Sequence, residues 1–314
     1  MAIAELTFLV IALAVLARST NLVVDGAVKL ADFFRIGHLA IGFVLVSTAT
    51  SLPELMVSVI SSGQGEGGIA VGNVFGSNIA NVLFVLGLSA FLFNIRMQYK
   101  DWREITFLVL IVTIITVGMV LLSGLGRLEG IFLLLLYGVY IFHLLRKKTH
   151  GEFSNHVTRS RAGRAFLVFS LGILLILISS AFVVELAVSL ADEMGLAKSF
   201  VGATVIALGT SLPELAVELQ AVRQKKYGLA LGDAVGSMAT NLTLVLGAGA
   251  LIHTIVLNLS IFLVFMAFSI FSNMLLFYFI VTSNQLGRRE GILFLATYVF
   301  YLVIIFHVQL GEIA

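Results

Sequence analysis

The chain has 314 residues, of which 60% are hydrophobic and 11% are charged, with a net charge of +2 and a mean hydropathy of +1.09. A soluble protein of this length carries about 25% charged residues, so the composition excludes a soluble domain and indicates an integral membrane protein. The absence of cysteine excludes disulfides and thiolate metal sites.

The apolar segments predict ten transmembrane helices, since about 20 apolar residues are needed to cross a bilayer. In chain order these spans are about 4–30, 38–62, 68–93, 103–122, 126–146, 164–191, 198–222, 228–252, 258–281 and 287–308. The expected fold class is therefore all-α and integral to the membrane. The most polar stretch, 146–164, is expected to be a basic linker between the halves 1–145 and 165–314.

The two halves repeat each other. Residues 50–54, Thr-Ser-Leu-Pro-Glu, recur at 210–214 and contain the only two prolines. At the same offset of 160, Gly72, Gly76, Ser77 and Asn81 recur as Gly232, Gly236, Ser237 and Asn241, and residues 126–131 resemble 287–292 at an offset of 161. Because each half has an odd number of spans, the second must enter the membrane from the opposite side. We therefore expect two inverted five-helix repeats.

The distribution of basic residues predicts the orientation. If the central linker is cytoplasmic and both termini are outside, 16 of the 19 Lys and Arg residues fall on the cytoplasmic side, Arg18 lies within the first span, and only Arg127 and Lys198 fall outside. Such a bias is what the positive-inside rule predicts. The expected location is the cell membrane, with the lipid bilayer and transported cations as partners and no role for nucleic acid.

The repeated pentapeptide places a helix breaker beside a carboxylate inside each second span. Pro53 cannot donate to the carbonyl of Ala49, nor Pro213 to that of Gly209. An ionised Glu at mid-bilayer costs roughly 2.5–3.5 kcal/mol or more. Helix packing does not require a carboxylate at this depth, so it does not account for this free-energy cost. We therefore interpret Glu54 and Glu214 as functional ligands.

The neighbouring residues supply further oxygen atoms. Thr50 and Ser51, repeated as Thr210 and Ser211, lie within one turn of the freed carbonyls, and Ser77 and Asn81 share one face of the third span. Inverted symmetry brings the two clusters together at mid-membrane. Hard oxygen donors without His or Cys suit Ca²⁺ or Na⁺ and not a soft transition metal. Helix packing is the simpler interpretation of the repeated glycines.

Three further charged residues lie in apolar spans. Arg18 is expected to extend towards the interface or to pair with a carboxylate. Glu218 and Asp233 stand where the first half has Ser58 and Asn73. These two could bind protons or form a peripheral site, but we favour a wet vestibule near a helix end.

The two copies of Gly/Ala-Thr-Ser-Leu-Pro-Glu, each followed by Gly-Asn/Asp-x-x-Gly-Ser-x-x-x-Asn, resemble the α-repeats of the sodium/calcium exchanger family. The resemblance covers the whole chain and, with its short central loop, suggests a prokaryotic-type member. It implies that the ion ligands are Thr50, Ser51, Glu54, Ser77 and Asn81 together with Thr210, Ser211, Glu214, Ser237 and Asn241. It also implies a backbone-carbonyl ligand at Ala207, whose counterpart is Ser47.

The expected function is secondary antiport of Na⁺ and Ca²⁺ by alternating access, with both ions as transported substrates and no organic cofactor. In the resembled family the leading spans of each half, here about 4–30 and 164–191, slide across the rest. At the position of Met238, members of the resembled family usually have Asn.

The alternative function is exchange of Ca²⁺ or another divalent cation for H⁺, since buried carboxylates also bind protons. An intramembrane enzyme would need a catalytic pair deep in the spans, and mid-span His is absent.

Overall fold

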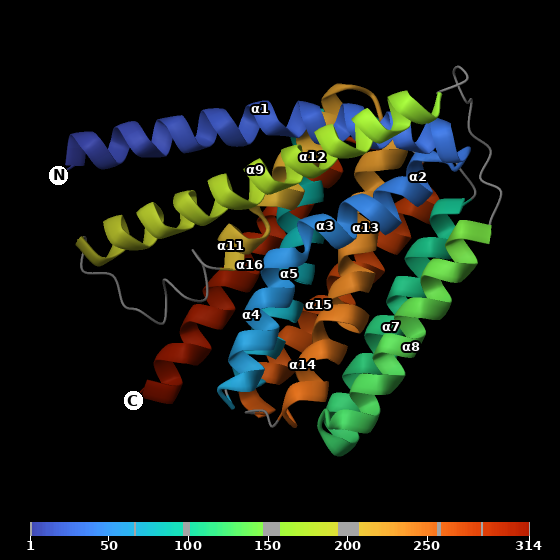
Figure 1. Cartoon of the computed structure of the whole chain (residues 1–314). Coiled ribbons are helices and arrows are strands. Elements are labelled where there is room, and N and C mark those ends of the chain that lie inside the picture. The colour runs from blue at the N-terminus through green and yellow to red at the C-terminus, as the bar shows by residue number, and fades with distance from the viewer. Residues whose placement is uncertain are drawn as a thin grey trace.

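The structure is a computed structural model that describes residues 2–65, 67–96, 101–146, 158–193, 207–255, 259–283 and 285–313. It is built almost entirely of helices (Figure 1). Those of the first half are α1 (Ala2–Phe34), α2 (His38–Ile41), the π-helical turn η1 (Gly42–Val46), α3 (Ser47–Thr50), α4 (Leu52–Gly63), α5 (Gly67–Ala80), η2 (Asn81–Leu86), α6 (Gly87–Leu92), α7 (Asp101–Ser123) and α8 (Arg127–Arg146).

The second half follows the same order. It contains α9 (Arg159–Glu193), α11 (Ala207–Thr210), α12 (Leu212–Arg223), α13 (Tyr227–Thr240), η4 (Asn241–Val245), α14 (Leu246–Ile252), α15 (Leu259–Thr282) and α16 (Arg288–Ile313). Helix α9 begins at Arg159, five residues before the expected start of its span, so the end of the expected linker is helical. The first part of the expected span 198–222 lies outside the described residues.

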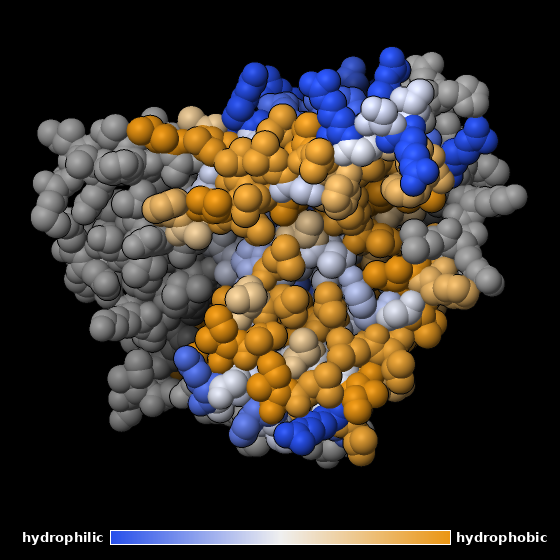
Figure 2. Space-filling view, in the orientation of Figure 1, coloured by the Kyte–Doolittle hydropathy of each residue, from blue (hydrophilic) through white to orange (hydrophobic). Residues whose placement is uncertain are grey.

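Five helical segments within the described residues are long and apolar enough to cross a membrane, or six if the bent pair His38–Thr50 and Leu52–Gly63 counts as one span. The outward faces of the helices carry large apolar side chains, among them Leu128 and Leu135 on α8 and Leu167 on α9, which are 78%, 65% and 69% exposed. Figure 2 shows hydrophobic surface as a broad band between hydrophilic patches at the top and bottom of the view. Apolar exposure on this scale indicates contact with lipid.

Helices α1 and α9 pack along each other and cross the ends of the other helices (Figure 1). Glycines permit the close approach, because a methyl group at Gly26 would lie 2.8 Å from Cβ of Phe169. A methyl group at Gly172 would likewise lie 2.9 Å from Cγ2 of Val23. The two long helices therefore form one pair, placed against the remaining helices.

The predicted helix breaks fall at the two prolines. The segments before and after Ser51 meet at 45°, and Pro53 lies in the first turn of α4. Ser51 has φ −80° and ψ 9°, and Ser211 has nearly the same values, φ −88° and ψ 5°, between α11 and α12. The backbone of these two serines leaves the helical region because proline lacks the donor that would continue the ladder.

The third helical stretch of each half also contains an irregularity. A π-helical turn begins at Asn81 in the first half and at Asn241 in the second. Such turns insert an additional residue into an α-helix and are frequent at functional sites. Both predicted amide ligands thus stand at the point where the local backbone geometry changes.

Two short pairings close the ends of the helices. Strands β1 (Ile95–Arg96) and β2 (Gln285–Leu286) are antiparallel, with Ile95 opposite Leu286. Leu125 and Ile255 form a second antiparallel bridge through two backbone hydrogen bonds of 3.4 and 2.8 Å. Ile95 and Ile255 are 160 positions apart, and Leu125 and Leu286 are 161 apart, so equivalent positions of the sequence repeat make the same pairing twice.

Candidate functional site

Two acidic side chains are buried in the interior of the helix bundle. Glu54, in the first turn of α4, is 0% exposed, and Glu214, in the first turn of α12, is 1% exposed. The Oε2 atom of each carboxylate has no hydrogen-bond partner among the described residues. A buried carboxylate without a partner is costly unless a counter-charge or a proton compensates it.

Hydroxyl groups from both halves surround the Glu54 carboxylate. Ser77 on α5 donates to Oε1 of Glu54 at 3.3 Å, and its hydroxyl lies 3.4 Å from that of Thr210 on α11. Asn73 holds the backbone at this point by donating its amide to the carbonyl oxygen of Glu54 at 3.0 Å. The environment of Glu54 thus includes a side chain from the opposite half of the chain.

The Glu214 carboxylate has the reciprocal arrangement. Ser51, at the bend of the first half, donates to Oε1 of Glu214 at 3.3 Å. Thr50 lies 3.5 Å from Ser237 on α13, the counterpart of the contact between Thr210 and Ser77. All of these side chains are at most 8% exposed. The structure therefore brings together seven of the twelve predicted site residues: Glu54, Glu214, Thr50, Thr210, Ser51, Ser77 and Ser237. Ser211 is buried at the second bend, and its hydroxyl has no partner among the described residues.

The two predicted carbonyl positions are the first residues of short helices. Ser47 begins α3 and is fully buried, and its hydroxyl donates to the carbonyl oxygen of Phe43. Ala207 begins α11, and the structure describes its backbone alone. Both carbonyls thus lie one turn before the bends at Ser51 and Ser211.

The two asparagines are buried but differ in their contacts. Both polar atoms of the Asn81 side chain lack a partner among the described residues. Asn241 donates instead to Oδ1 of Asn78 at 3.1 Å, and Asn78 donates to the carbonyl oxygen of Met238 at 3.2 Å. Comparison of the two halves did not select Asn78, because the residue at its position in the second half is Met238. The sequence did contain one indication of its importance, since Asn78 is an amide within an apolar span, one residue after Ser77.

The expectation of a wet vestibule for Glu218 and Asp233 was wrong. Both are 0% exposed, and Asp233 accepts a hydrogen bond from Thr50 at 3.2 Å. Glu218 is enclosed by the packed helices, and neither of its carboxylate oxygens has a hydrogen-bond partner among the described residues. Tight packing of α12 and α13 against the first half excludes water from these positions. Arg18 is exposed on α1.

The arrangement can bind a hard cation. Carboxylate, hydroxyl, amide and carbonyl oxygens are the ligands of Ca²⁺ and Na⁺. Among the described residues there is no group of three or more His, Cys, Asp or Glu side chains positioned to hold a metal ion. A cation at this centre would have neutral oxygens as ligands in addition to the two carboxylates.

These features define a multi-pass membrane protein with a buried centre lined by oxygen atoms. The family model of the sodium/calcium exchanger protein matches residues 5–146 and 164–307. The chain belongs to the sodium/calcium exchanger family, whose members are transporters and not enzymes.

Relatives in bacteria and archaea share most of the chain. It is 33% identical over 256 residues to inner membrane protein YrbG of Escherichia coli, covering 78% of each protein. It is 28% identical over 346 residues to the sodium/calcium exchanger MaX1 of Methanosarcina acetivorans, covering 96% of this chain and 98% of MaX1. A structure of the sodium-calcium exchanger NCX_Mj soaked with Na⁺ and without Ca²⁺ superposes with a TM-score of 0.86 at 27% identity, covering 96% of this chain and 99% of NCX_Mj.

Proposed function

We propose that the protein is a secondary antiporter that exchanges Na⁺ for Ca²⁺ at the centre between α4 and α12. The observation that supports this most directly is the reciprocal contact of Ser51 with Glu214 and of Ser77 with Glu54 and Thr210. It joins two buried carboxylates from different halves, each with one oxygen atom that has no described partner. The proposed ligands are the twelve predicted site residues.

We also propose that the halves 1–145 and 165–314 are inverted five-helix repeats joined by a basic cytoplasmic linker, which gives ten spans. The doubled pairing of Ile95 with Leu286 and of Leu125 with Ile255 supports this arrangement. The glycine contacts support it as well, since a methyl group at Gly130 would meet α14 and one at Gly291 would meet α6. Under this arrangement both termini lie outside the cell.

Charge neutralisation explains why exchange would be obligatory. One Ca²⁺ neutralises both carboxylates, and so do two Na⁺ ions, whereas an empty site leaves two negative charges in a dehydrated interior. The empty site is therefore reluctant to change its side of access. Movement of the α1–α9 pair across the other helices would expose the centre to each side in turn.

Flux into proteoliposomes tests the proposal. An outward Na⁺ gradient should drive ⁴⁵Ca²⁺ uptake, and Glu54→Gln or Glu214→Gln should each abolish it, because one negative charge is lost from the site. Glu129→Gln and Glu290→Gln are matched controls. These two residues occupy equivalent positions of the repeat, as Glu54 and Glu214 do. Their carboxylates lie at helix starts, where they accept hydrogen bonds from the backbone N–H groups of Gly126 and Gly287. Unchanged flux in both site variants would refute the assignment.

The second candidate is exchange of Ca²⁺ or another divalent cation for H⁺. Glu218 and Asp233 favour it, because they add two fully buried carboxyl groups that the first half lacks. Such groups can carry protons when no cation compensates them. Uptake that follows an imposed pH gradient and ignores Na⁺ would replace Na⁺ coupling with this mechanism.

A further inference from the structure

A basic pocket lies at one end of the molecule, away from the buried centre. It has a volume of about 460 Å³ and is formed where the end of α6 and strand β1 meet the end of α12 and the start of α13. Arg96, Arg223 and Lys225 line it, and all three side chains are exposed. None of its described lining residues is acidic, so its positive charge is not neutralised from within.

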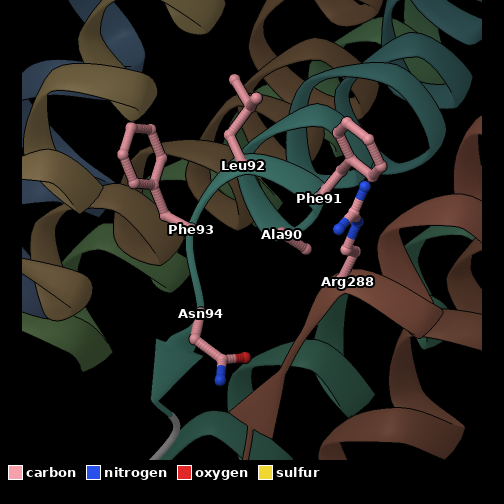
Figure 3. Close-up of a pocket in the computed structure, with 6 residues that line it drawn as sticks. All are labelled: Ala90, Phe91, Leu92, Phe93, Asn94 and Arg288. Carbon is pink, nitrogen blue, oxygen red and sulfur yellow. The ribbon is translucent and has the colours of Figure 1, made fainter.

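A second pocket of about 420 Å³ adjoins the first and shares Leu92, Phe93 and Asn94 with it. Figure 3 shows Arg288 on the far side of this segment, with its guanidinium beside the ring of Phe91. The guanidinium carbon lies 5.0 Å from the ring centre. Leu92 and Phe93, which line both pockets, are 52% and 37% exposed. Exposed apolar side chains therefore separate Arg288 in the second pocket from the three cations of the basic pocket.

Within the described residues, the equivalent corner of the other half contains no Lys or Arg. There the end of α14 meets the end of α4, and a methyl group at Gly67 would lie 3.0 Å from Ile255. At an offset of 160, glycines 63, 65 and 67 replace Arg223, Lys225 and Tyr227 of the basic pocket. The fold alone therefore does not require cations at this corner. The positive-inside rule favours basic residues on one side, but it does not require three of them to line one pocket.

Lys225 adopts a backbone conformation that lysine rarely uses. Its φ is 59°, and its counterpart in the repeat, Gly65, has a φ of 81°. Both halves thus make the same turn, which glycine adopts without steric cost and lysine does not. A lysine at this position has a conformational cost that its side chain must offset elsewhere.

We propose that this pocket binds the phosphate headgroup of an anionic phospholipid of the surrounding membrane. Arginine forks and a lysine ammonium group are suited to phosphate oxygens. The exposed Leu92 and Phe93 provide an apolar edge for the acyl chains, which a free phosphate ion would not need. Basic pockets of this kind, between membrane helices on one face, recognise lipid headgroups.

Native mass spectrometry of the purified full-length protein tests the proposal with phosphatidylglycerol and phosphatidylcholine as probes. The wild type should bind phosphatidylglycerol selectively, and the triple variant R96Q/R223Q/K225Q should lose affinity on the order of a hundredfold, from roughly fivefold per cation. The control R159Q/R161Q/R164Q removes the same charge from the exposed start of α9, outside the pocket, and should bind like the wild type.

Equal loss in the triple variant and the control would overturn the proposal, as would equal binding of both lipids or displacement of phosphatidylglycerol by an equal concentration of inorganic phosphate. Lys225→Gly separates binding from folding. Because glycine fits a φ of 59°, this variant should melt at the same or a higher temperature in neutral lipid, yet bind phosphatidylglycerol about fivefold more weakly. Wild-type binding by this stable variant would refute a role for Lys225.

Discussion

Gly236 provides a sensitive test of how closely the two halves must pack beside the candidate site. A methyl group at this position of α13 would lie 2.7 Å from the carbonyl oxygen of Phe43, 2.7 Å from Oγ of Ser47 and 2.8 Å from Cα of Phe43. Ordinary contacts between carbon atoms are about 3.5 Å or longer, so Gly236→Ala requires α13 and η1 to separate by roughly 0.7 Å. Two of the three atoms belong to the backbone and cannot rotate away.

The cost of this separation follows from two opposing effects. Overpacking costs about 1–3 kcal/mol, and the better helix propensity of alanine returns about 1 kcal/mol. The net loss is therefore about 0–2 kcal/mol, and its midpoint of about 1 kcal/mol corresponds to about fivefold in binding. Because Ser47 and Thr50 move with η1, we expect Gly236→Ala to raise the Ca²⁺ concentration for half-maximal uptake about fivefold.

The assay compares this variant with Gly138→Ala. Gly138 lies in the middle of α8, is exposed, and a methyl group added there would have no described atom within 4 Å. Gly138→Ala should leave both melting temperature and Ca²⁺ dependence unchanged or slightly improved. Wild-type stability and Ca²⁺ dependence in Gly236→Ala would refute the claim that this packing sets the ligand geometry.

Three other changes test separate parts of the structure. Asn78→Ala should destabilise the protein by about 1–3 kcal/mol, seen as a lower melting temperature, because the buried amide of Asn241 loses its acceptor; an unchanged melting temperature would contradict that contact. Cysteines at Ile95 and Leu286, in a chain without native cysteine, should form a disulfide under mild oxidation because the two residues are paired in β1 and β2, and failure to form it would argue against the pairing. A single cysteine at Asn155 in the linker should be protected from an impermeant thiol reagent in intact cells, whereas labelling from outside would reverse the proposed orientation.

The sequence specified the helical elements well because membrane spans have a strong local signature. Long apolar runs predicted helices within a few residues of those described, such as 228–252 against 227–252. Proline acts on its own helix, so the break at Ser51 also followed from local chemistry. The predicted start of a helix was wrong where polar residues extend it beyond the apolar run, as in α9, which begins at Arg159.

The assignment of site residues drew on the repeat, since matched Glu, Ser and Asn at one offset are difficult to explain by packing alone. Asn78 escaped it because repeat matching selects only residues that both halves share. The prediction that Asp233 and Glu218 face a wet vestibule was wrong because the sequence pattern does not show what surrounds a side chain. In a chain that is apolar throughout, hydropathy does not distinguish a side chain facing lipid or water from one facing another helix.

By itself, then, the sequence determined what each segment is, because helix formation and helix breakage depend on neighbours within a turn or two. Only the tertiary structure decided which side chains meet, as when Ser51 donates to Glu214 and Ser77 contacts Thr210. Those contacts join residues more than 130 positions apart and depend on the rotation and separation of packed helices, which no local pattern encodes.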